Sequence, residues 1–256
     1  MNQESPKNIQ SLQRAINILN CFNANSTSLS VKEISSRLNL NINTTRGLIN
    51  TLANNNLLVH DPITNTYSLG LFFLSKANLI QKQTEQFVQY AKRFAKDIAE
   101  TYNVLCSLQV VNNTDVFSVY SAHSTKAKYH INIIKYEALP IYATSSGKLV
   151  LYYNMYQNDH SCLDSLDLTS YTPKTLDTVE KLQREMLNIE KNGYSYEIEE
   201  FDLDVAGMAV PIIDSMSNLH YTLSITTFSN HFKSIKKALT KDLLKISEKM
   251  SLDFFA

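Results

Sequence analysis

The stretch SLSVKEISSRLNLNINTTRGLINTLANNNLL, from Ser28 to Leu58, has the pattern of two short helices joined by a very tight turn. Ser30 and Glu33 have the S-x-x-E spacing of a capping box, which predicts where the first helix starts. Asn41 or Asn43 can cap the second helix, because an Asn side chain accepts hydrogen bonds from free backbone N–H groups. The stretch therefore predicts a helix-turn-helix.

The second helix of this pair has two contrasting faces. The inward face is expected to hold Thr45, Leu48, Ile49 and Leu52, and the outward face Asn43, Arg46, Gly47, Asn50 and Asn54. A merely solvated helix face would also be polar. Asn and Arg, however, form paired hydrogen bonds with base edges, and Thr can contact phosphates or a thymine methyl group. Because the capping box, the turn and a following hairpin occur in order, we favour a helix that enters the DNA major groove.

The flanking segments complete a domain. A helix is expected from about Ser11 to Phe22, with Leu12, Ala15, Ile16, Leu19 and Phe22 facing inward. Downstream, LLVHDPITNTYSL (57–69) predicts two strands around an Asp-Pro turn. Three helices and a hairpin make a winged helix-turn-helix. Its predicted DNA-contacting residues are Asn41, Asn43, Thr44, Thr45, Arg46, Gly47 and Asn50 from the helix and Thr64, Asn65 and Thr66 from the wing.

Composition fits a two-domain globular protein. The chain has 256 residues, of which 44% are hydrophobic and 19% charged, and its net charge is zero. Residues 1–70 hold five Lys and Arg against three acids, a local charge of +2. Neither a signal-peptide core nor an apolar run of the ~18–20 residues needed to span a bilayer occurs. We therefore expect a cytoplasmic protein without a membrane partner.

The sequence gives little support for catalysis or cofactor binding. Three widely spaced cysteines do not suggest a disulfide framework, and Cys106 reads as a buried small hydrophobe. Glycine-rich nucleotide motifs and H-x-x-x-H, H-E-x-x-H or C-x-x-C pairs are missing from the sequence. His123 and His130 could meet across two strands and hold a metal, but two solvated histidines are the simpler reading. We expect neither a cofactor nor a metal.

One acidic cluster leaves an enzymatic alternative open. Glu197, Glu199 and Glu200 could serve as general acid and base in a metabolite-binding domain. Charged clusters on loops are usually solvated, so we expect a protein that is not an enzyme. A purely structural adaptor would leave the polar helix face unexplained.

Beyond residue 70 the pattern changes to that of an α+β domain. We expect one helix or two in succession over 71–102, with a linker helix at 71–83 and a helix from Thr84 that opens the second domain, 84–256. Strands are expected at 104–113, 115–123, 129–136, 207–215 and 219–228, and helices at 146–155, 178–193 and 233–252, with Gly193 as a stop signal. Strands in meander order with helices packed on one face of the sheet would make an α+β domain.

Several of these segments together resemble the IclR family of transcriptional regulators. They are SLQRAINILNCF (11–22), LSVKEISSRLNLNINTTRGLINTLANNNLLVHDPITNTYSLG (29–70), LPIYATSSGKLVLYY (139–153) and NGYSYEIEEFDLDVAGMAVPIID (192–214). The resemblance implies a winged helix-turn-helix, residues 1–70, joined by a linker helix to a GAF- or PAS-like domain whose curved antiparallel sheet is flanked by helices. It also implies a small-molecule effector, and a homodimer or dimer of dimers that binds a palindromic operator. Members of this family more often act as repressors than as activators.

The chain departs from the family at two places. Gly47 stands where the recognition helix usually carries Arg, and Arg46 lies beside it. Either the backbone approaches DNA closely at Gly47, or Arg46 has taken over the cationic role. Ala206 and Gly207 stand where the effector domain usually has an Arg-Cys pair.

The resemblance also implies an effector site, carried over to Ser145, Ser146, Glu197, Gly207, Ser224 and Thr226. Ser145 and Ser146 are expected at a helix N-terminus, which favours an anion. Ser224 and Thr226 are two apart on a strand, so their hydroxyls share a face. A small carboxylate fits such a site, with Glu197 either accepting from a ligand hydroxyl or lying outside it. The alternative is that Ser224 and Thr226 only form hydrogen bonds within the sheet.

Overall fold

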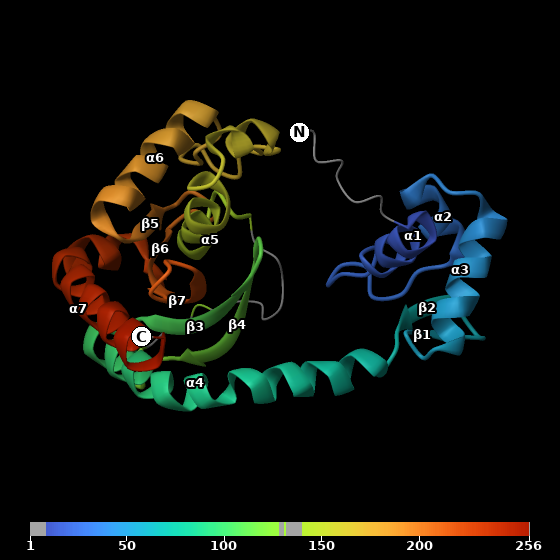
Figure 1. Cartoon of the computed structure of the whole chain (residues 1–256), viewed down its shortest axis with the longest axis horizontal. Helices are drawn as coiled ribbons and strands as arrows, with labels where there is room; N and C mark the ends of the chain where they lie inside the picture. Colours follow the sequence, from blue (N-terminus) through green and yellow to red (C-terminus); the bar gives the residue numbers. More distant parts are fainter. Residues whose placement is uncertain (1–8, 128–130, 132–139, 256) are drawn as a thin grey trace. The chain divides into compact units, whose positions relative to one another are not determined.

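The computed structural model describes residues 9–127, 131 and 140–255, and the chain divides into two compact units, Met1–Gln83 and Thr84–Ala256 (Figure 1). The strand expected at 129–136 lies, apart from Ile131, outside the described residues. No helix in the described ranges is both long and apolar enough to cross a membrane.

The smaller unit is a winged helix-turn-helix. Its described residues form α1 (Gln10–Leu19), α2 (Val31–Leu38) and α3 (Ile42–Asn54), then the antiparallel hairpin of β1 (Leu58–Asp61) and β2 (Thr66–Leu69), and finally the start of the long helix α4 (Phe72–Tyr102). Backbone hydrogen bonds in both directions join Leu29 to Tyr67 at 2.9 and 2.8 Å, so the segment before α2 is tied to the wing. The order of elements predicted from the sequence is confirmed.

The core of this unit differs from expectation at α1. Leu12 and Ile16, predicted to face inward, are 58% and 42% exposed, whereas Ile18 is fully buried beside Cys21 and Phe22. The helix ends at Leu19 rather than at Phe22. Cys21 and Phe22 therefore enter the core from the segment after the helix, and the face of α1 that carries Ile18 packs inward with them.

The larger unit is built on a five-stranded antiparallel sheet in the order β4-β3-β7-β6-β5. The strands are β3 (Leu105–Asn112), β4 (Asp115–Ala122), β5 (Ser195–Ile198), β6 (Val205–Ile213) and β7 (Leu219–Phe228). The expected meander is only partly right. The β3–β4 hairpin and the β5–β6–β7 meander each follow the chain, but they join through the distant pair β3 and β7.

Helices cover both faces of this sheet, not one as expected (Figure 1). On one face, α4 (Phe72–Tyr102) and α7 (Ser229–Phe255) pack on the apolar side chains of the central strands. On the other lie α5 (Ser145–Val150), a π-helical turn (Leu151–Tyr156), a 3-10 helix (His160–Ser165) and α6 (Val179–Asn192). This second layer has an apolar core of its own, which meets the sheet at the buried Ala209 and Leu219 and at the partly buried Val111, Val116 and Ile213.

Two local expectations about helices have clear outcomes. The segment from 72 to 102 forms one continuous helix, α4, rather than two in succession. Gly193 ends α6 with φ 74°, in the left-handed region that favours glycine.

Candidate functional site

The helix-turn-helix is held by the capping interactions that the sequence predicted. Ser30 N–H donates to Glu33 Oε2 at 2.7 Å, and Glu33 N–H donates back to Ser30 Oγ at 3.3 Å. The Ser30 hydroxyl also donates to Glu33 Oε2 at 2.6 Å, and this bond, followed by the one from Ser30 N–H, lowers the pKa of Glu33. Asn39 ends α2 with φ 50°, and Asn41 caps α3 by accepting from Asn43 N–H at 2.8 Å. The turn between α2 and α3 can be short because Asn39 adopts the left-handed conformation that ends α2, and two residues later the side chain of Asn41 caps the start of α3.

The outward face of α3 is polar and exposed. Asn43, Thr44, Arg46, Gly47 and Asn50 are all exposed, while Ile49 and Leu52 are buried in the core of the unit. No ion pair of Arg46 with an acidic group occurs among the described residues. An α-helix with this exposure can place amide and guanidinium donors against base edges.

Thr45 is a correction to the predicted DNA-contacting set. Its side chain has 0% exposure, and its hydroxyl donates to the Asn41 carbonyl at 3.1 Å. Helical spacing turns this position toward Ile49 and Leu52. Thr45 therefore stabilises the start of α3 from the inside and cannot contact DNA.

Gly47 lies on the open side of α3. A methyl group built on its Cα would meet no atom within 4 Å. Thr51 Oγ1 donates to the Gly47 carbonyl at 3.0 Å, one turn along the helix. Packing within the unit therefore does not require glycine here.

The predicted wing residues form a hydrogen-bonded tip. Thr64 Oγ1 donates to Asp61 Oδ2 at 2.8 Å, and Thr64 and Thr66 hydroxyls lie 2.7 Å apart. Asn65 has φ 54° and its amide oxygen lies 3.1 Å from His60 Nε2. The tip is thus ordered by its own side chains, while Thr64 and Asn65 remain exposed.

Of the predicted effector residues, Ser224 lies on the sheet face under α5 and Ser146 lies in α5 itself, and with Gln109 and Thr222 they form a largely buried polar layer. Ser146, Thr222 and Ser224 all donate their hydroxyl protons to Gln109 Oε1, over 2.9 Å for Thr222 and 3.1 Å for Ser224. Ser224 also approaches the Ser107 carbonyl at 3.5 Å. The reading that Ser224 bonds within the sheet therefore describes this structure correctly, and Gln109 is its acceptor.

A second part of this layer brings together three predicted residues. A Cβ placed on Gly207 would lie 3.0 Å from Ser145 Oγ and 3.4 Å from Glu197 Oε1. Glycine at this position therefore lets α5 and β5 approach the same point of β6. Glu197 is only 6% exposed and accepts from Glu200 N–H at 3.0 Å. Burial, the largest influence, raises the pKa of Glu197 to about 7.

The acidic cluster is engaged in structural interactions. Glu200 accepts from Lys148 Nζ at 2.9 and 3.0 Å, and Lys148 is completely buried. Glu199 pairs with the partly exposed Lys174 at 2.6 Å. No group of three or more His, Cys, Asp or Glu side chains suited to a metal exists in the described part of the chain. His130 is not among the described residues, so the His123–His130 alternative lies outside them.

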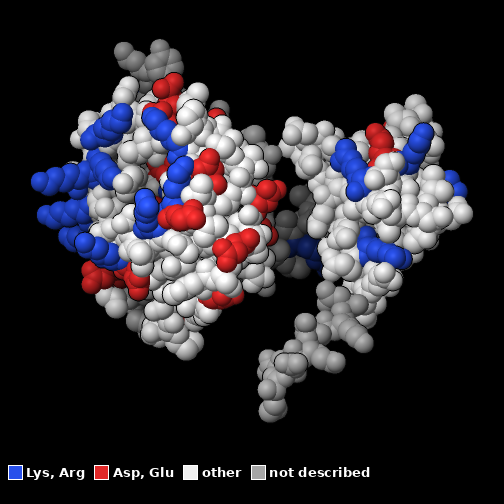
Figure 2. Space-filling view, turned by 90° about the horizontal axis from the view of Figure 1, so that it is seen from above, with Lys and Arg blue, Asp and Glu red and all other residues white. Residues whose placement is uncertain are grey.

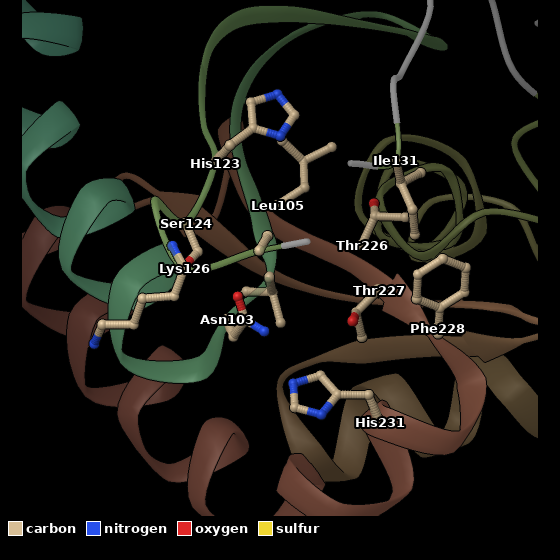
Figure 3. A pocket seen from close by; sticks show the side chains of 12 residues that line it. Asn103, Leu105, His123, Ser124, Lys126, Ile131, Thr226, Thr227, Phe228 and His231 are labelled. Carbon is tan, nitrogen blue, oxygen red and sulfur yellow. The ribbon is translucent and has the colours of Figure 1, made fainter. Parts of the chain in front are cut away.

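An open cavity of about 330 Å³ lies at the end of the sheet where β3 begins and β7 ends (Figure 3). Thr226 is the one predicted effector residue among those that line it. His123, from the segment after β4, and His231, from α7, lie on opposite sides of the cavity, with Thr226 and Thr227 between them (Figure 3). The cavity was not foreseen from the sequence.

Sequence reasoning also missed Gln109 and Lys148. Gln109 is a polar residue within the apolar run of β3, and Lys148 lies in the quoted LPIYATSSGKLVLYY segment without an assigned role. A polar or charged residue inside an otherwise apolar run signals a buried group that needs partners. Which partners it finds depends on strands and helices far away in the sequence.

Charge is distributed unevenly over the surface. Figure 2 shows basic side chains projecting from the side of the larger unit where α7 lies in Figure 1, while the visible face of the smaller unit is mostly uncharged. On this face of the smaller unit the basic side chains are scattered and do not form one continuous patch.

A winged helix-turn-helix followed by an α+β domain with a ligand-sized cavity defines a DNA-binding regulator with an effector-binding domain. A family model for the bacterial transcriptional regulator IclR C-terminal domain matches residues 82–252, and one for the IclR helix-turn-helix domain matches residues 11–62. The chain belongs to the IclR family of transcriptional regulators. Its relatives are named as regulators, a non-enzymatic family, and the expectation that it is not an enzyme is confirmed.

Two relatives illustrate the match. The HTH-type transcriptional regulator XynR of Escherichia coli is 24% identical over 237 residues, covering 93% of each chain. The HTH-type transcriptional repressor AllR of Escherichia coli is 24% identical over 223 residues, covering 86% of this chain and 80% of the relative.

Solved structures share the fold. An IclR family regulator from Brucella abortus aligns with a TM-score of 0.82 at 18% identity, covering 97% of this chain and 93% of that one. An IclR homologue from Microbacterium hydrocarbonoxydans, complexed with 4-hydroxybenzoate, aligns with a TM-score of 0.70 at 20% identity, covering 95% and 98%. The predicted fold class is confirmed.

Proposed function

We propose that the protein is a sequence-specific repressor that binds a palindromic operator and changes its operator affinity when a small carboxylate binds the effector domain. The observation that carries the DNA-binding part is the face of α3, where Asn43, Arg46 and Asn50 are exposed above a buried apolar seam. A protein with this role acts in the cytoplasm. The name of the related repressor AllR supports repression.

Base reading is assigned to the exposed donors of α3. Arg46 can make a bidentate pair with a guanine edge, and Asn43 and Asn50 can each pair with adenine. Asn41, Thr44 and the Gly47 backbone lie on the same exposed surface and suit phosphate contacts. Thr64, Asn65 and Thr66 of the wing would contact the backbone or the minor groove.

Specific binding by this unit requires more than one copy. One recognition helix reads only a few base pairs, and residues 1–70 carry a charge of only +2. A homodimer or dimer of dimers would place helices on half-sites about one helical turn apart or a multiple of it. Leu71 and Leu74 are 79% and 70% exposed beside the half-exposed Phe72, and we propose this cluster as part of the dimer contact.

The effector is assigned to the polar sheet face. Three hydroxyls already converge on the Gln109 oxygen, so a ligand carboxylate could replace that oxygen as their acceptor. Ser145, Glu197, Gly207 and Thr226 complete the proposed site. The 4-hydroxybenzoate bound to a structural relative supports a carboxylate ligand.

The direct test of this proposal is binding to the DNA upstream of the protein's own gene, measured by fluorescence anisotropy against a scrambled fragment of equal length. Specific binding is expected, with light scattering that reports a dimer or tetramer at micromolar concentration. A panel of small carboxylates should then contain one that raises the melting temperature and releases the operator. Equal affinity for both fragments would contradict the proposal.

A further inference from the structure

Helix α7 carries a row of lysines on its exposed side. They recur at intervals of four residues and are all exposed: Lys233, Lys237, Lys241, Lys245 and Lys249. Because one helical turn takes 3.6 residues, positions four apart are neighbours on the same side of a helix. The buried apolar residues of α7 pack on the sheet from its other side, and they include Phe232, Leu239, Leu243 and Met250. The lysine row therefore faces solvent along about 24 Å of helix.

The lysine row concentrates positive charge in an otherwise acidic unit. Residues 71–228 hold thirteen Lys and Arg against eighteen Asp and Glu, a charge of −5, whereas residues 229–256 hold six Lys against three acids, a charge of +3. Basic side chains accordingly gather on the side of the larger unit where α7 lies (Figures 1 and 2). An anionic partner would be attracted to α7 and repelled by the rest of this unit.

Acidic groups lie at the two ends of the lysine row but not at its middle. Lys249 pairs with Asp253 at 2.9 Å, and Lys233 lies within electrostatic range of the Glu199 carboxylate. Within the described ranges no ion pair is formed by the three central lysines, which are Lys237, Lys241 and Lys245. Their charges are therefore available to a partner.

The fold does not account for the three central lysines. Like charges four residues apart on a helix repel each other and destabilise it. The helix dipole favours cations in the last turn, where α7 has none. Asp242 accepts a hydrogen bond from the Tyr102 hydroxyl of α4 at 2.6 Å, and the exposed Glu248 follows the central lysines along the helix. A pattern that breaks a local stability rule without a structural gain indicates a function.

We propose that the three central lysines bind the phosphate backbone of DNA that flanks the operator half-sites. The inference deepens the proposed function and rests on it, because it names a second DNA-contacting surface, in the larger unit. Residues 1–70 carry a charge of only +2, although phosphate contacts supply a large share of the affinity of DNA-binding proteins. The central lysines span about 12 Å of helix, which equals the axial length of about three or four phosphates along one strand.

The chemistry of the lysine row favours DNA over a protein or a membrane. Protein interfaces depend on aromatic or arginine anchors, whereas the exposed residues between these lysines are Ser234 and Ala238. A helix that lies on a membrane needs an exposed apolar face, and the apolar face of α7 is buried against the sheet. Lysine is a flexible point charge, which suits contacts with phosphates that carry no sequence information.

The experiment measures the affinity of the full chain for two DNA fragments. The shorter is the smallest piece of the DNA upstream of the protein's own gene that the protein still distinguishes from a scrambled sequence. The longer adds about fifteen base pairs at each end, one and a half helical turns. We expect the longer fragment to bind more tightly, with an advantage that falls at least tenfold between about 50 and 200 mM salt, the effect of about two phosphate contacts. Hydroxyl-radical footprinting should show protection of the added backbone.

Two triple variants make the test specific. Lys237→Gln, Lys241→Gln and Lys245→Gln together should remove the advantage of the longer fragment and leave the affinity for the shorter one unchanged. Gln has nearly the helix propensity of Lys, so this variant should fold. The matched control removes the same charge from exposed positions of α6, on the other face of the sheet, by Lys181→Gln, Arg184→Gln and Lys191→Gln. Where the α7 triple variant fails to fold, Lys241→Gln alone should lose about a third of the added salt dependence.

Three results would overturn the inference: equal affinity of the parent for both fragments at low salt, an advantage that persists in the folded α7 variant, or an equal loss in the α6 control. Polyglutamate that binds the parent but not the α7 variant, with DNA binding unchanged, would assign the lysine row to an acidic protein instead. If no fragment is distinguished from scrambled DNA, the proposed function fails, and the lysine row is then tested on scrambled DNA of the two lengths.

Discussion

Lys148 Nζ lies 2.9 Å from Glu200 Oε1, and the lysine side chain has no exposure to solvent. Glu185 Oε1 lies 3.3 Å away and the Tyr196 carbonyl 2.7 Å away, so one ammonium group joins α5, α6 and the β5 region. A buried charge persists only when it is paired and hydrogen-bonded. The interaction fixes α5 above the polar face of the sheet, which we propose as the effector site.

Replacement of Lys148 by Met should be strongly destabilising. It leaves Glu200 and Glu185 without their cation in a buried place, and breaking such a pair typically costs about 3–5 kcal/mol. Denaturant unfolding of the full chain measures the change. Lys174→Met is the control, since Lys174 is 52% exposed and its pair with Glu199 should contribute less than ~1 kcal/mol. Equal losses in the two variants would show that Lys148 is not the structural centre we describe.

Glu197 should make stability depend on pH. Burial raises its pKa from an ordinary 4.5 to about 7, so in this range the folded state holds a proton that the unfolded chain has released. The free energy of unfolding therefore falls as the pH rises from 4.5 to 7, and remains lower above it. Glu197→Gln should reduce this fall, measured as melting temperature between pH 5 and 8. An unchanged slope would mean that Glu197 is ionised throughout.

Gly47→Ala separates stability from DNA contact. Ala is favoured over Gly within a helix by about 1 kcal/mol, and the added methyl group meets no atom within 4 Å. The variant should be more stable than the parent, whereas Gly193→Ala should be less stable because Gly193 has φ 74°. If the α3 backbone approaches DNA closely at Gly47, the same methyl group should weaken operator binding. Unchanged operator affinity would leave the cationic role to Arg46.

Local patterns predicted the smaller unit well because its signals lie within a few residues of each other. The Ser30–Glu33 capping box, the Asn41 cap and the Asp61–Thr66 turn each depend on near neighbours along the chain. The exception is α1, where an apolar stripe at helical spacing gave no information about which face meets α2 and α3. Burial of Ile18 instead of Leu12 is decided by that tertiary packing.

The larger unit was less predictable from the sequence because its contacts join segments that are far apart along the chain. Pairing of β3 with β7 brings Gln109 to Thr222 and Ser224, more than a hundred residues away. The cavity likewise needs the ends of α4, β4 and β7 together with the start of α7. Alternation along one strand shows which residues share a face, but not which strand lies beside it.

The central claim is that α3 reads DNA sequence through Arg46, and the most direct test is the affinity of Arg46→Ala for operator and for scrambled DNA at several salt concentrations. We predict a loss of roughly 1–3 kcal/mol on the operator, little loss on scrambled DNA and a nearly unchanged salt dependence. Lys32→Ala, an exposed cation on α2, is the matched control for the loss of one charge. An equal loss on both DNAs, with a weaker salt dependence, would make Arg46 a phosphate contact and contradict the claim.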